Sequence, residues 1–327
     1  MKNLVKNFSK QIREAIIIGK KASFTEHNSK LQNVLISGLG GSGIGGSIAT
    51  FLTENEAKIP VAVNKNYFLP NYIDSNSLVI ICSYSGNTEE TVNCLKEAIK
   101  KNAKIICITS GGKIAEEANK NNLDIITIPG GMPPRSCLGY SLIQLFYVLN
   151  YFGVINSGFE KQFEAAADLI DKEENSILIE AKLIAEKLFN KTPVIYSETS
   201  TEGVSIRFRQ QLNENSKILC WHHVFPEMNH NELVGWRDQR NDLAVIILRN
   251  NTDYERIQKR MEISKETFKK YCPTIIDLYS KGNSAVEKTM YLVNITDWIS
   301  CFLADLRGVD AVEVNVIDHL KSELIKA

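Results

Sequence analysis

The stretch that decides the fold of this chain is Ser83-Tyr84-Ser85-Gly86-Asn87-Thr88-Glu89-Glu90-Thr91. It follows a continuous apolar, β-branched run at residues 78–82 (LVIIC), which is typical of a strand buried on both faces. From residue 89 to residue 100 the apolar spacing becomes helical. The stretch is therefore predicted to lie between the carboxyl end of a strand and the amino end of a helix. Unpaired backbone amides and the positive end of the helix dipole make that position attractive to anions.

Three hydroxyl side chains in this loop favour phosphate as the anion. Ser83, Ser85 and Thr88 can each donate a hydrogen bond to a phosphate without adding charge. The alternative is an ordinary helix cap, because Asn87 followed three residues later by Glu90 fits a capping box. Capping needs one hydroxyl or amide, whereas this loop has four such residues around one glycine. Phosphate binding is therefore the preferred interpretation.

A second glycine-rich segment lies earlier in the chain. The predicted strand at residues 33–37 (NVLIS) runs into residues 38–47 (GLGGSGIGGS), which open a helix. The GxGxxG spacing in this segment also occurs in nicotinamide-dinucleotide sites. Such a site expects an acidic residue after the next strand, but residues 60–64 (PVAVN) lead into Lys-Asn. The alternative is that the glycines let the backbone approach a sugar. The residues that would bind substrate there are Gly41, Ser42 and Gly43.

The order of strands and helices predicts the fold class. Further buried strands are expected at residues 103–109 and 123–128, and a long apolar helix at residues 138–152. Strands that alternate with helices in this way form a parallel sheet covered on both faces. We therefore predict an α/β, doubly wound first domain at residues 1–153.

The same order repeats in a second predicted domain at residues 154–327. A charge-rich helical stretch at residues 159–189 leads to it, and strands are predicted at three further places: 193–197, 243–248 and 274–278. The two halves thus look like an internal duplication of one α/β unit. After the strand at 243–248 the chain reads Arg249-Asn250-Asn251-Thr252-Asp253, without serine or glycine. The second half is expected to keep the fold but not the phosphate loop.

Composition excludes several classes of protein. The chain has 327 residues, of which 44% are hydrophobic, and 38 basic residues balance 38 acidic ones. Zero net charge argues against nucleic acid as a partner. No apolar run approaches the roughly 20 residues that span a bilayer, and no signal peptide is recognised, so we expect a cytoplasmic protein that binds no membrane. The seven cysteines are scattered without metal-ligand spacing, which predicts reduced core residues.

A rigid loop at residues 129–136 (PGGMPPRS) places one arginine, Arg135, just before the apolar helix. An arginine at that position is suited to contact an oxyanion or a phosphate. The local sequence equally fits a surface arginine that caps the helix.

Ionisable residues crowd between residues 210 and 236. The group consists of His222, His223, His230, Glu214, Glu227 and Glu232. Metal-binding patterns such as HExxH are absent from this stretch, so a general base with a separate general acid is the preferred chemistry. The alternative for any one of them is a satisfied polar residue at an interface.

Taken together, these motifs resemble the bifunctional phosphoglucose/phosphomannose isomerases of the sugar isomerase (SIS) domain superfamily. The resemblance covers nearly the whole chain. Its specific pieces are GLGGSGIGG (38–46), SYSGNTEET (83–91), ITSGG (108–112), PGGMPPR (129–135), LNENSK (212–217) and PEMNHNE (226–232). The resemblance implies two tandem SIS domains in a homodimer with the active site near the subunit interface. It also implies a sugar-phosphate substrate, interconversion of aldose and ketose 6-phosphates, and no cofactor or metal.

The resemblance also implies roles for single residues. The matches to phosphate ligands are Ser42, Ser83, Ser85 and Thr88. Glu214 matches the base that moves a proton between carbon 1 and carbon 2, and Arg135 matches the arginine that stabilises the enediolate. His230 matches the ring-opening residue, which in this superfamily often reaches a neighbouring subunit's site. A carboxy-terminal threonine is associated with accepting mannose, whereas residues 308–316 (GVDAVEVNV) contain none.

Two other functions remain open at the level of sequence. One is another SIS enzyme that acts on an amino-sugar phosphate, although no amidotransferase domain is recognised ahead of residue 33. The other is a non-catalytic sugar-phosphate sensor. Sensors of this kind carry a DNA-binding module, for which about 30 residues are too few.

Overall fold

The computed structural model describes residues 1–27 and 29–326, and the chain forms two compact units. We call one of them the N-terminal unit, which comprises Lys6–Lys172 and Gly282–Met290. The C-terminal unit comprises Met1–Val5, Glu173–Lys281 and the residues from Tyr291 onward. The boundary between the two units thus falls within a long helix, α7 (Phe159–Leu188). The domain boundary expected between residues 153 and 154 stays a prediction.

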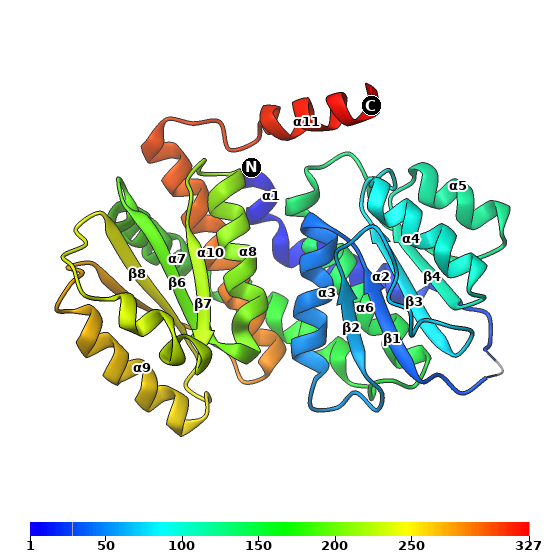
Figure 1. Ribbon diagram of the computed structural model, residues 1–327, viewed down its shortest axis with the longest axis horizontal. Coiled ribbons are helices and arrows are strands. Elements are labelled where there is room, and N and C mark those ends of the chain that lie inside the picture. Colours follow the sequence, from blue (N-terminus) through cyan, green and yellow to red (C-terminus); the bar gives the residue numbers. More distant parts are fainter. Residues whose placement is uncertain (28, 327) are drawn as a thin grey trace. The chain divides into compact units, whose positions relative to one another are not determined.

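The N-terminal unit is built on a five-stranded sheet with the order β2-β1-β3-β4-β5 (Figure 1), in which every neighbouring pair is parallel. Its strands are β1 (Asn33–Ser37), β2 (Val61–Asn64), β3 (Ser77–Ser83), β4 (Lys104–Thr109) and β5 (Asp124–Thr127). The apolar run at residues 78–82 lies in the central strand β3, where every residue is buried. The sequence-based prediction of a parallel α/β sheet is confirmed for this half.

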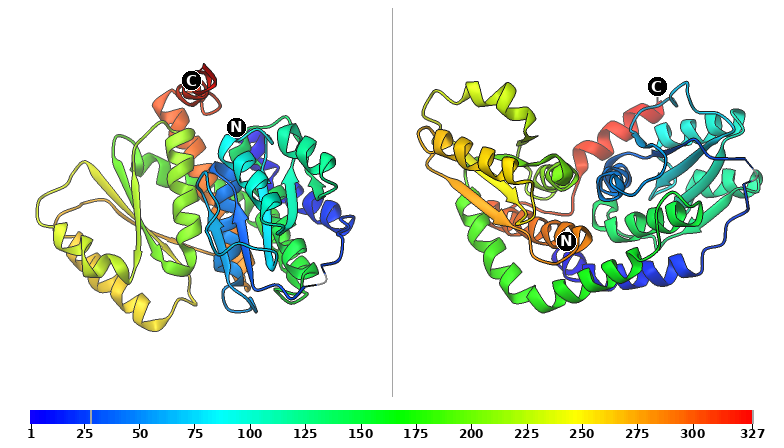
Figure 2. Two further views of the ribbon diagram at one scale, coloured as in Figure 1. Left: turned by 45° about the vertical axis from the view of Figure 1, so that its right-hand side comes forward. Right: turned by 90° about the horizontal axis from the view of Figure 1, so that it is seen from below.

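Helices cover both faces of this sheet (Figure 2). On one face α2 (Phe8–Lys20) and α3 (Gly40–Thr53) pack with α6 (Leu138–Tyr151). On the other face lie α4 (Glu89–Lys100) and α5 (Gly112–Lys120). The chain therefore leaves β1 toward one face and the adjacent β3 toward the other. In open parallel sheets, ligands bind at the carboxyl edge where neighbouring connections diverge in this way.

The C-terminal unit repeats this topology with four parallel strands in the order β7-β6-β8-β9. Its strands are β6 (Thr192–Glu198), β7 (Trp221–Phe225), β8 (Leu243–Arg249) and β9 (Ile275–Tyr279). The order matches the first four strands of the other sheet, and the buried strand β8 takes the place of β3. Two parallel sheets flanked by helices thus confirm the predicted fold class.

The strand β7 was not predicted from sequence. It is an edge strand that pairs with β6 alone, and only its last two residues are buried. An edge strand needs no continuous apolar run, and here Trp221 and two histidines interrupt the pattern. The ionisable stretch at residues 210–236 is therefore partly sheet.

Besides α7, the helices of the C-terminal unit include α1 (Lys2–Lys6), α8 (Glu202–Glu214), α9 (Glu255–Phe268) and most of α10 (Ala285–Arg307). A further helix, α11 (Asn315–Lys326), was not predicted. A fully buried ion pair joins α8 to α10, with Arg207 Nη2 2.6 Å from Asp297 Oδ2. Gln211 donates a further hydrogen bond to the same carboxylate. Burial raises the pKa of Asp297, whereas Arg207 and Gln211 oppose that shift.

Within the described residues, the helices are all too short or too polar to cross a membrane. The seven cysteines all carry free thiols, and six of them are buried. This burial agrees with the expectation of core residues.

One glycine illustrates how closely the loops of the N-terminal unit pack. Gly86 has φ +70°, and a Cβ added to it would lie 1.7 Å from the carbonyl oxygen of Gly111. Its own amide donates to Ser83, and its carbonyl accepts from Ile114. The loop after β3 therefore packs backbone to backbone against the loop after β4.

We predict that Gly86→Ala destabilises the protein by about 3 kcal/mol or more, because it adds a steric clash to an unfavourable φ. The matched control is Gly153→Ala, since Gly153 has φ +69° and no atom within 4 Å of its added Cβ. Strain alone costs roughly 1–2 kcal/mol there. Urea unfolding followed by circular dichroism measures both losses. Equal losses in the two variants would contradict the argument.

Candidate active site

Four hydroxyl residues meet at the carboxyl edge of the first sheet, between β1 and β3. Ser42 lies in the first turn of α3, and Ser83 ends β3; both are buried. Ser85 is exposed and Thr88 is half-buried in the loop that leads into α4. The structure therefore brings together all four predicted phosphate ligands. The amino ends of α3 and α4 meet the same edge.

The internal hydrogen bonds at this edge leave the hydroxyl protons of Ser42, Ser85 and Thr88 available for an anion. The Tyr84 amide donates to Ser42 Oγ at 3.1 Å, and the Asn87 amide donates to Ser85 Oγ at 3.3 Å. Ser83 Oγ donates to Thr88 Oγ1 at 3.2 Å. A hydroxyl whose oxygen accepts a bond can still donate its proton elsewhere. Ser42, Ser85 and Thr88 are thus arranged as donors.

The capping-box interpretation of this loop is wrong. The residue that caps α4 is Thr88, and its side chain makes no capping hydrogen bond. The Asn87 side chain instead donates to the carbonyl of Ser85 and accepts from the amide of Lys113. It ties the phosphate loop to the start of α5. The hydroxyls and the amide of this loop therefore do not serve to cap the start of α4.

The glycine-rich turn after β1 lets other backbone approach α3. A Cβ on Gly43 would lie 2.5 Å from the carbonyl oxygen of Gly38, and one on Gly41 would lie 2.9 Å from that of Pro134. The neighbouring strand β2 ends at Asn64. The side-chain amide of Asn64 donates hydrogen bonds to nearby backbone carbonyls and to the thiol of Cys94. The position at which a dinucleotide fold expects an acidic residue is thus taken by a structural asparagine.

Arg135 lies in the short 3-10 helix η1 (Pro134–Ser136) and is 5% exposed. The alternative of a surface arginine is therefore wrong. The contact between Gly41 and Pro134 sets the backbone of this arginine against the first turn of α3. Arg135 therefore belongs to the same edge of the sheet as the hydroxyl residues.

Gln11 was missed by sequence analysis, yet it holds the segment after Arg135. Its Nε2 donates to the carbonyl of Ser136 at 2.9 Å, and its Oε1 accepts from the amide of Gly139 at 2.7 Å. Gln11 is itself buried in α2. A contact across more than 120 residues leaves no local signal in the sequence.

Glu214 is the last residue of α8 and is half-buried. The two residues after it are fully buried and fixed to α10: Asn215 donates to Ser300 Oγ, and Ser216 donates to the carbonyl of Ser300. Lys217 donates to the carbonyl of Glu214 itself. These bonds fix the end of the helix that carries the candidate base.

His230 ends the 3-10 helix η3 (Glu227–His230), just after β7, and is exposed. The two neighbouring carboxylates are engaged elsewhere. Glu232 accepts from Tyr196 at 2.6 Å and from Trp221 at 3.0 Å, and Glu227 accepts from Asn231 at 2.8 Å. Both carboxylates therefore have partners other than His230.

The other two histidines of this stretch lie in β7. His222 Nε2 is 3.7 Å from Glu202, and the Val224 amide donates to His223 Nδ1. Across the part of the chain that the structure describes, no group of three or more His, Cys, Asp or Glu side chains is placed to hold a metal ion.

Glu214 and His230 lie at opposite edges of the second sheet. The helix α8 leaves the carboxyl end of β6 and runs back to the amino edge, where Glu214 ends it (Figure 1). The chain then passes along β7, whose five residues span about 16 Å, before it reaches His230. The structure therefore does not bring these two residues of one chain together.

In the C-terminal unit, the loop after β8 (residues 249–253) corresponds to the loop after β3. Its polar side chains form ion pairs and hydrogen bonds with other residues of the same unit. Arg249 ends β8 and is buried, with Nε 2.7 Å from Asp277 and Nη2 2.6 Å from Glu262. Asp253 accepts from both the amide and the side chain of Asn250. These bonds support the expectation that the second half carries no phosphate loop.

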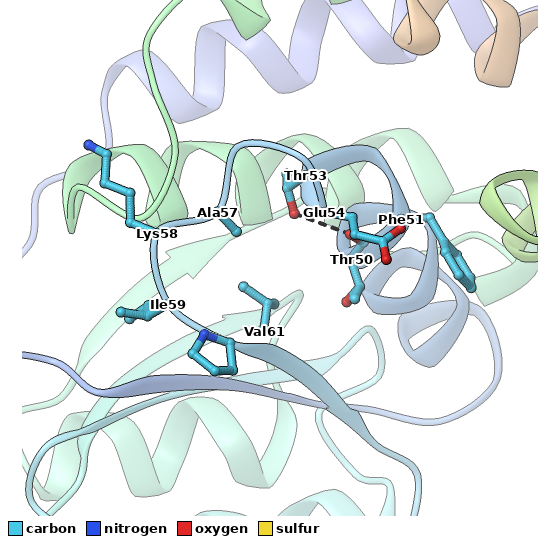
Figure 3. A pocket seen from close by; sticks show the side chains of 9 residues that line it. Thr50, Phe51, Thr53, Glu54, Ala57, Lys58, Ile59 and Val61 are labelled. Atoms are coloured by element: carbon cyan, nitrogen blue, oxygen red, sulfur yellow. Dashed lines mark hydrogen bonds between the residues drawn. The ribbon is translucent and has the colours of Figure 1, made fainter. Parts of the chain in front are cut away.

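A cavity of about 400 Å³ lies away from the candidate site, at the opposite edge of the first sheet (Figure 3). It is lined by the end of α3, the start of β2 and the segment between them, residues 50–61. Thr53 points back to its own helix, where its hydroxyl donates to Ala49 and Thr50. The predicted site residues lie at the carboxyl edge instead.

Comparison with known families recovers both halves of the chain. Residues 28–137 match the SIS domain, and residues 178–324 match the bacterial phospho-glucose isomerase C-terminal SIS domain. Among solved structures, the C-terminal domain of glucosamine-fructose-6-phosphate aminotransferase from Francisella tularensis superposes with a TM-score of 0.73 at 16% identity, covering 95% of this chain and 96% of that one. Tagatose-6-phosphate ketose/aldose isomerase from Escherichia coli gives 0.67 at 13% identity, covering 95% and 94%. These two likenesses show the fold.

Sequence relatives are more informative. The bifunctional phosphoglucose/phosphomannose isomerase of Caldicellulosiruptor bescii is 40% identical over 98% of this chain and 97% of its own length. The proteins of the same name from Aquifex aeolicus and Thermoplasma acidophilum are 37% and 38% identical, over 90% and 89% of this chain and 91% and 89% of their own lengths. The chain therefore belongs to the family of bifunctional phosphoglucose/phosphomannose isomerases, which confirms the resemblance seen in its motifs.

Proposed function

We propose that this protein interconverts glucose 6-phosphate and mannose 6-phosphate with fructose 6-phosphate. The observation that carries the proposal is the convergence of four hydroxyl side chains and one buried arginine at the carboxyl edge of the first sheet. Relatives across nearly the whole chain bear the name of this activity. An aldose and its 2-ketose are isomers, so the reaction exchanges no net electrons and needs no redox cofactor.

The phosphate is proposed to bind Ser42, Ser83, Ser85 and Thr88 together with the amino end of α4. No lysine or arginine stands among these ligands, so local donor geometry rather than a broad positive field holds the anion. Gly41 and Gly43, in the first turn of α3, are proposed to contact the sugar through their backbone. Binding energy from the phosphate then fixes the reacting end of the sugar.

Glu214 is proposed as the base. It removes the proton from carbon 2 of the open-chain aldose and returns it to carbon 1, while a second proton moves from the carbon 2 hydroxyl to the carbon 1 oxygen. Negative charge develops on these oxygens in the enediolate, where Arg135 is proposed to stabilise it. A donor directed at such an oxyanion contributes about 3 kcal/mol. A well-placed acid or base contributes roughly 10²- to 10⁴-fold in rate.

His230 is proposed to open the sugar ring in the site of a second copy of the chain. The support is geometric, because Glu214 and His230 of one chain are separated by the length of β7. One six-carbon substrate does not span that distance. A homodimer with exchanged histidines satisfies the need for both groups at one sugar.

The activity is tested by proton NMR of the purified protein with fructose 6-phosphate in the presence of a chelator. We expect glucose 6-phosphate and mannose 6-phosphate to appear, because no step needs a metal. Glucose 6-phosphate alone would narrow the function to one aldose, in line with the missing threonine at residues 308–316. Turnover of glucosamine 6-phosphate in place of both would favour an amino-sugar enzyme, and binding without a product would favour a sensor.

Replacing the base tests the mechanism. Glu214→Gln removes the carboxylate but keeps the shape of the side chain, so we expect kcat to fall by about 10²- to 10⁴-fold while the affinity for fructose 6-phosphate stays within about threefold. Stopped assays and isothermal titration calorimetry measure the two quantities. The control is Glu186→Gln, an exposed position on α7 that is expected to have no effect. Turnover near that of the unmodified protein would rule out Glu214 as the base.

Exchange of His230 between copies is tested by mixing two inactive variants, Glu214→Gln and His230→Ala. Random reassortment places both variants in about half of the dimers, and each mixed dimer then has one site with both groups intact. We expect the mixture to regain about a quarter of the unmodified activity. A mixture no more active than the sum of the separate variants would mean that His230 serves its own chain.

A further inference from the structure

Tyr84 connects all the loops that form the candidate phosphate site. It lies inside the phosphate loop and is 8% exposed. Its amide donates to Ser42 after β1, and its carbonyl accepts from the amide and the hydroxyl of Ser110 after β4. Its phenol oxygen accepts from the amide of Met132, after β5, at 3.1 Å. Only the last of these bonds depends on the side chain.

The phenol contacts both sides of Arg135. Met132 lies three residues before the arginine, and Cys137, two residues after it, is close enough to contribute to raising the pKa of Tyr84. The loop that contains Arg135 is rich in glycine and proline and makes few backbone bonds of its own. Gln11 holds the segment after Arg135, and the phenol of Tyr84 holds the segment before it at Met132.

We propose that the phenol of Tyr84 is a positioning residue that holds residues 132–137, and through them Arg135, in register with the phosphate loop. This inference rests on the proposed function, in which Arg135 stabilises the enediolate. Tyr84 does not itself act on the sugar. Its phenol holds Arg135 at a fixed position relative to the loop that is proposed to bind the phosphate, so that the guanidinium lies at the reacting end of the sugar.

The state of the phenol agrees with a positioning role. Burial is the largest cause that raises the pKa of Tyr84 above its ordinary value. The group therefore stays protonated at neutral pH and does not serve as a general base. Its oxygen is already engaged by the amide of Met132. Loss of the hydroxyl would leave that amide without this partner.

Tyr84→Phe removes only the hydroxyl and keeps the ring and the backbone bonds. We expect kcat to fall about 5- to 10-fold, the equivalent of one neutral hydrogen bond, with KM for fructose 6-phosphate within about twofold. The matched control is Tyr147→Phe, whose hydroxyl donates to the carbonyl of Ile16 at 3.2 Å, away from the candidate site. This control is expected to leave kcat unchanged.

A double-mutant cycle separates positioning from a general structural effect. In a background of Arg135→Lys, Tyr84→Phe should change kcat by less than about twofold further, because residues that act through one another are not additive. An equal loss of kcat in both backgrounds would overturn the proposal. So would a rise in KM at constant kcat, since that pattern belongs to phosphate binding.

A second measurement is independent of catalysis. Hydrogen exchange at the amide of Met132 should be at least about tenfold faster in Tyr84→Phe than in the unmodified protein, and unchanged in Tyr147→Phe. An unchanged exchange rate in Tyr84→Phe would refute the proposal that the phenol holds residues 132–137. If the unmodified protein shows no isomerase activity, the proposed function fails, and the exchange rate still decides whether Tyr84 fixes this loop.

Discussion

The candidate site depends on close backbone packing at one edge of a parallel sheet. Parallel strands bring all their carboxyl ends to the same edge, and the loops after β1, β3, β4 and β5 must share that space. Glycines make this possible: a Cβ at Gly86 would collide with Gly111, and one at Gly41 with Pro134. The hydroxyl side chains that are proposed to bind a phosphate are consequently carried on a closely packed backbone. A chain with zero net charge can then hold an anion without a basic patch.

The two units use one topology for different purposes. The strands β3 and β8 occupy the same central place in their sheets, and both are fully buried. After β3 the chain presents hydroxyls, whereas after β8 it presents Arg249, whose charge is met by Asp277 and Glu262. The two units thus share one scaffold, and only the loop after β3 presents the hydroxyls that are proposed to bind phosphate. In the proposed mechanism, the C-terminal unit contributes the acid-base groups, Glu214 and His230, instead.

The sequence predicted those features that arise from neighbouring residues. Apolar runs located the central strands, and the change of spacing at residue 89 placed the start of α4 correctly. Local patterns failed where the structure depends on distant contacts. They missed β7 because an edge strand is only half-buried. They left Arg135 open between surface and core because its burial arises in a segment that packs against the distant helix α3. Gln11 could not be found at all, since its partners lie more than 120 residues away.

The separation of Glu214 from His230 has a consequence for stability as well as for catalysis. Glu214 ends α8 and His230 ends η3, and the extended strand β7 lies between them in the chain. In the proposed mechanism, which needs both groups at one sugar, the site is completed by a second chain. Binding of the second chain stabilises the folded state by mass action, so dilution would weaken activity and stability together. An isomerase whose site was complete within one chain would show no such coupling.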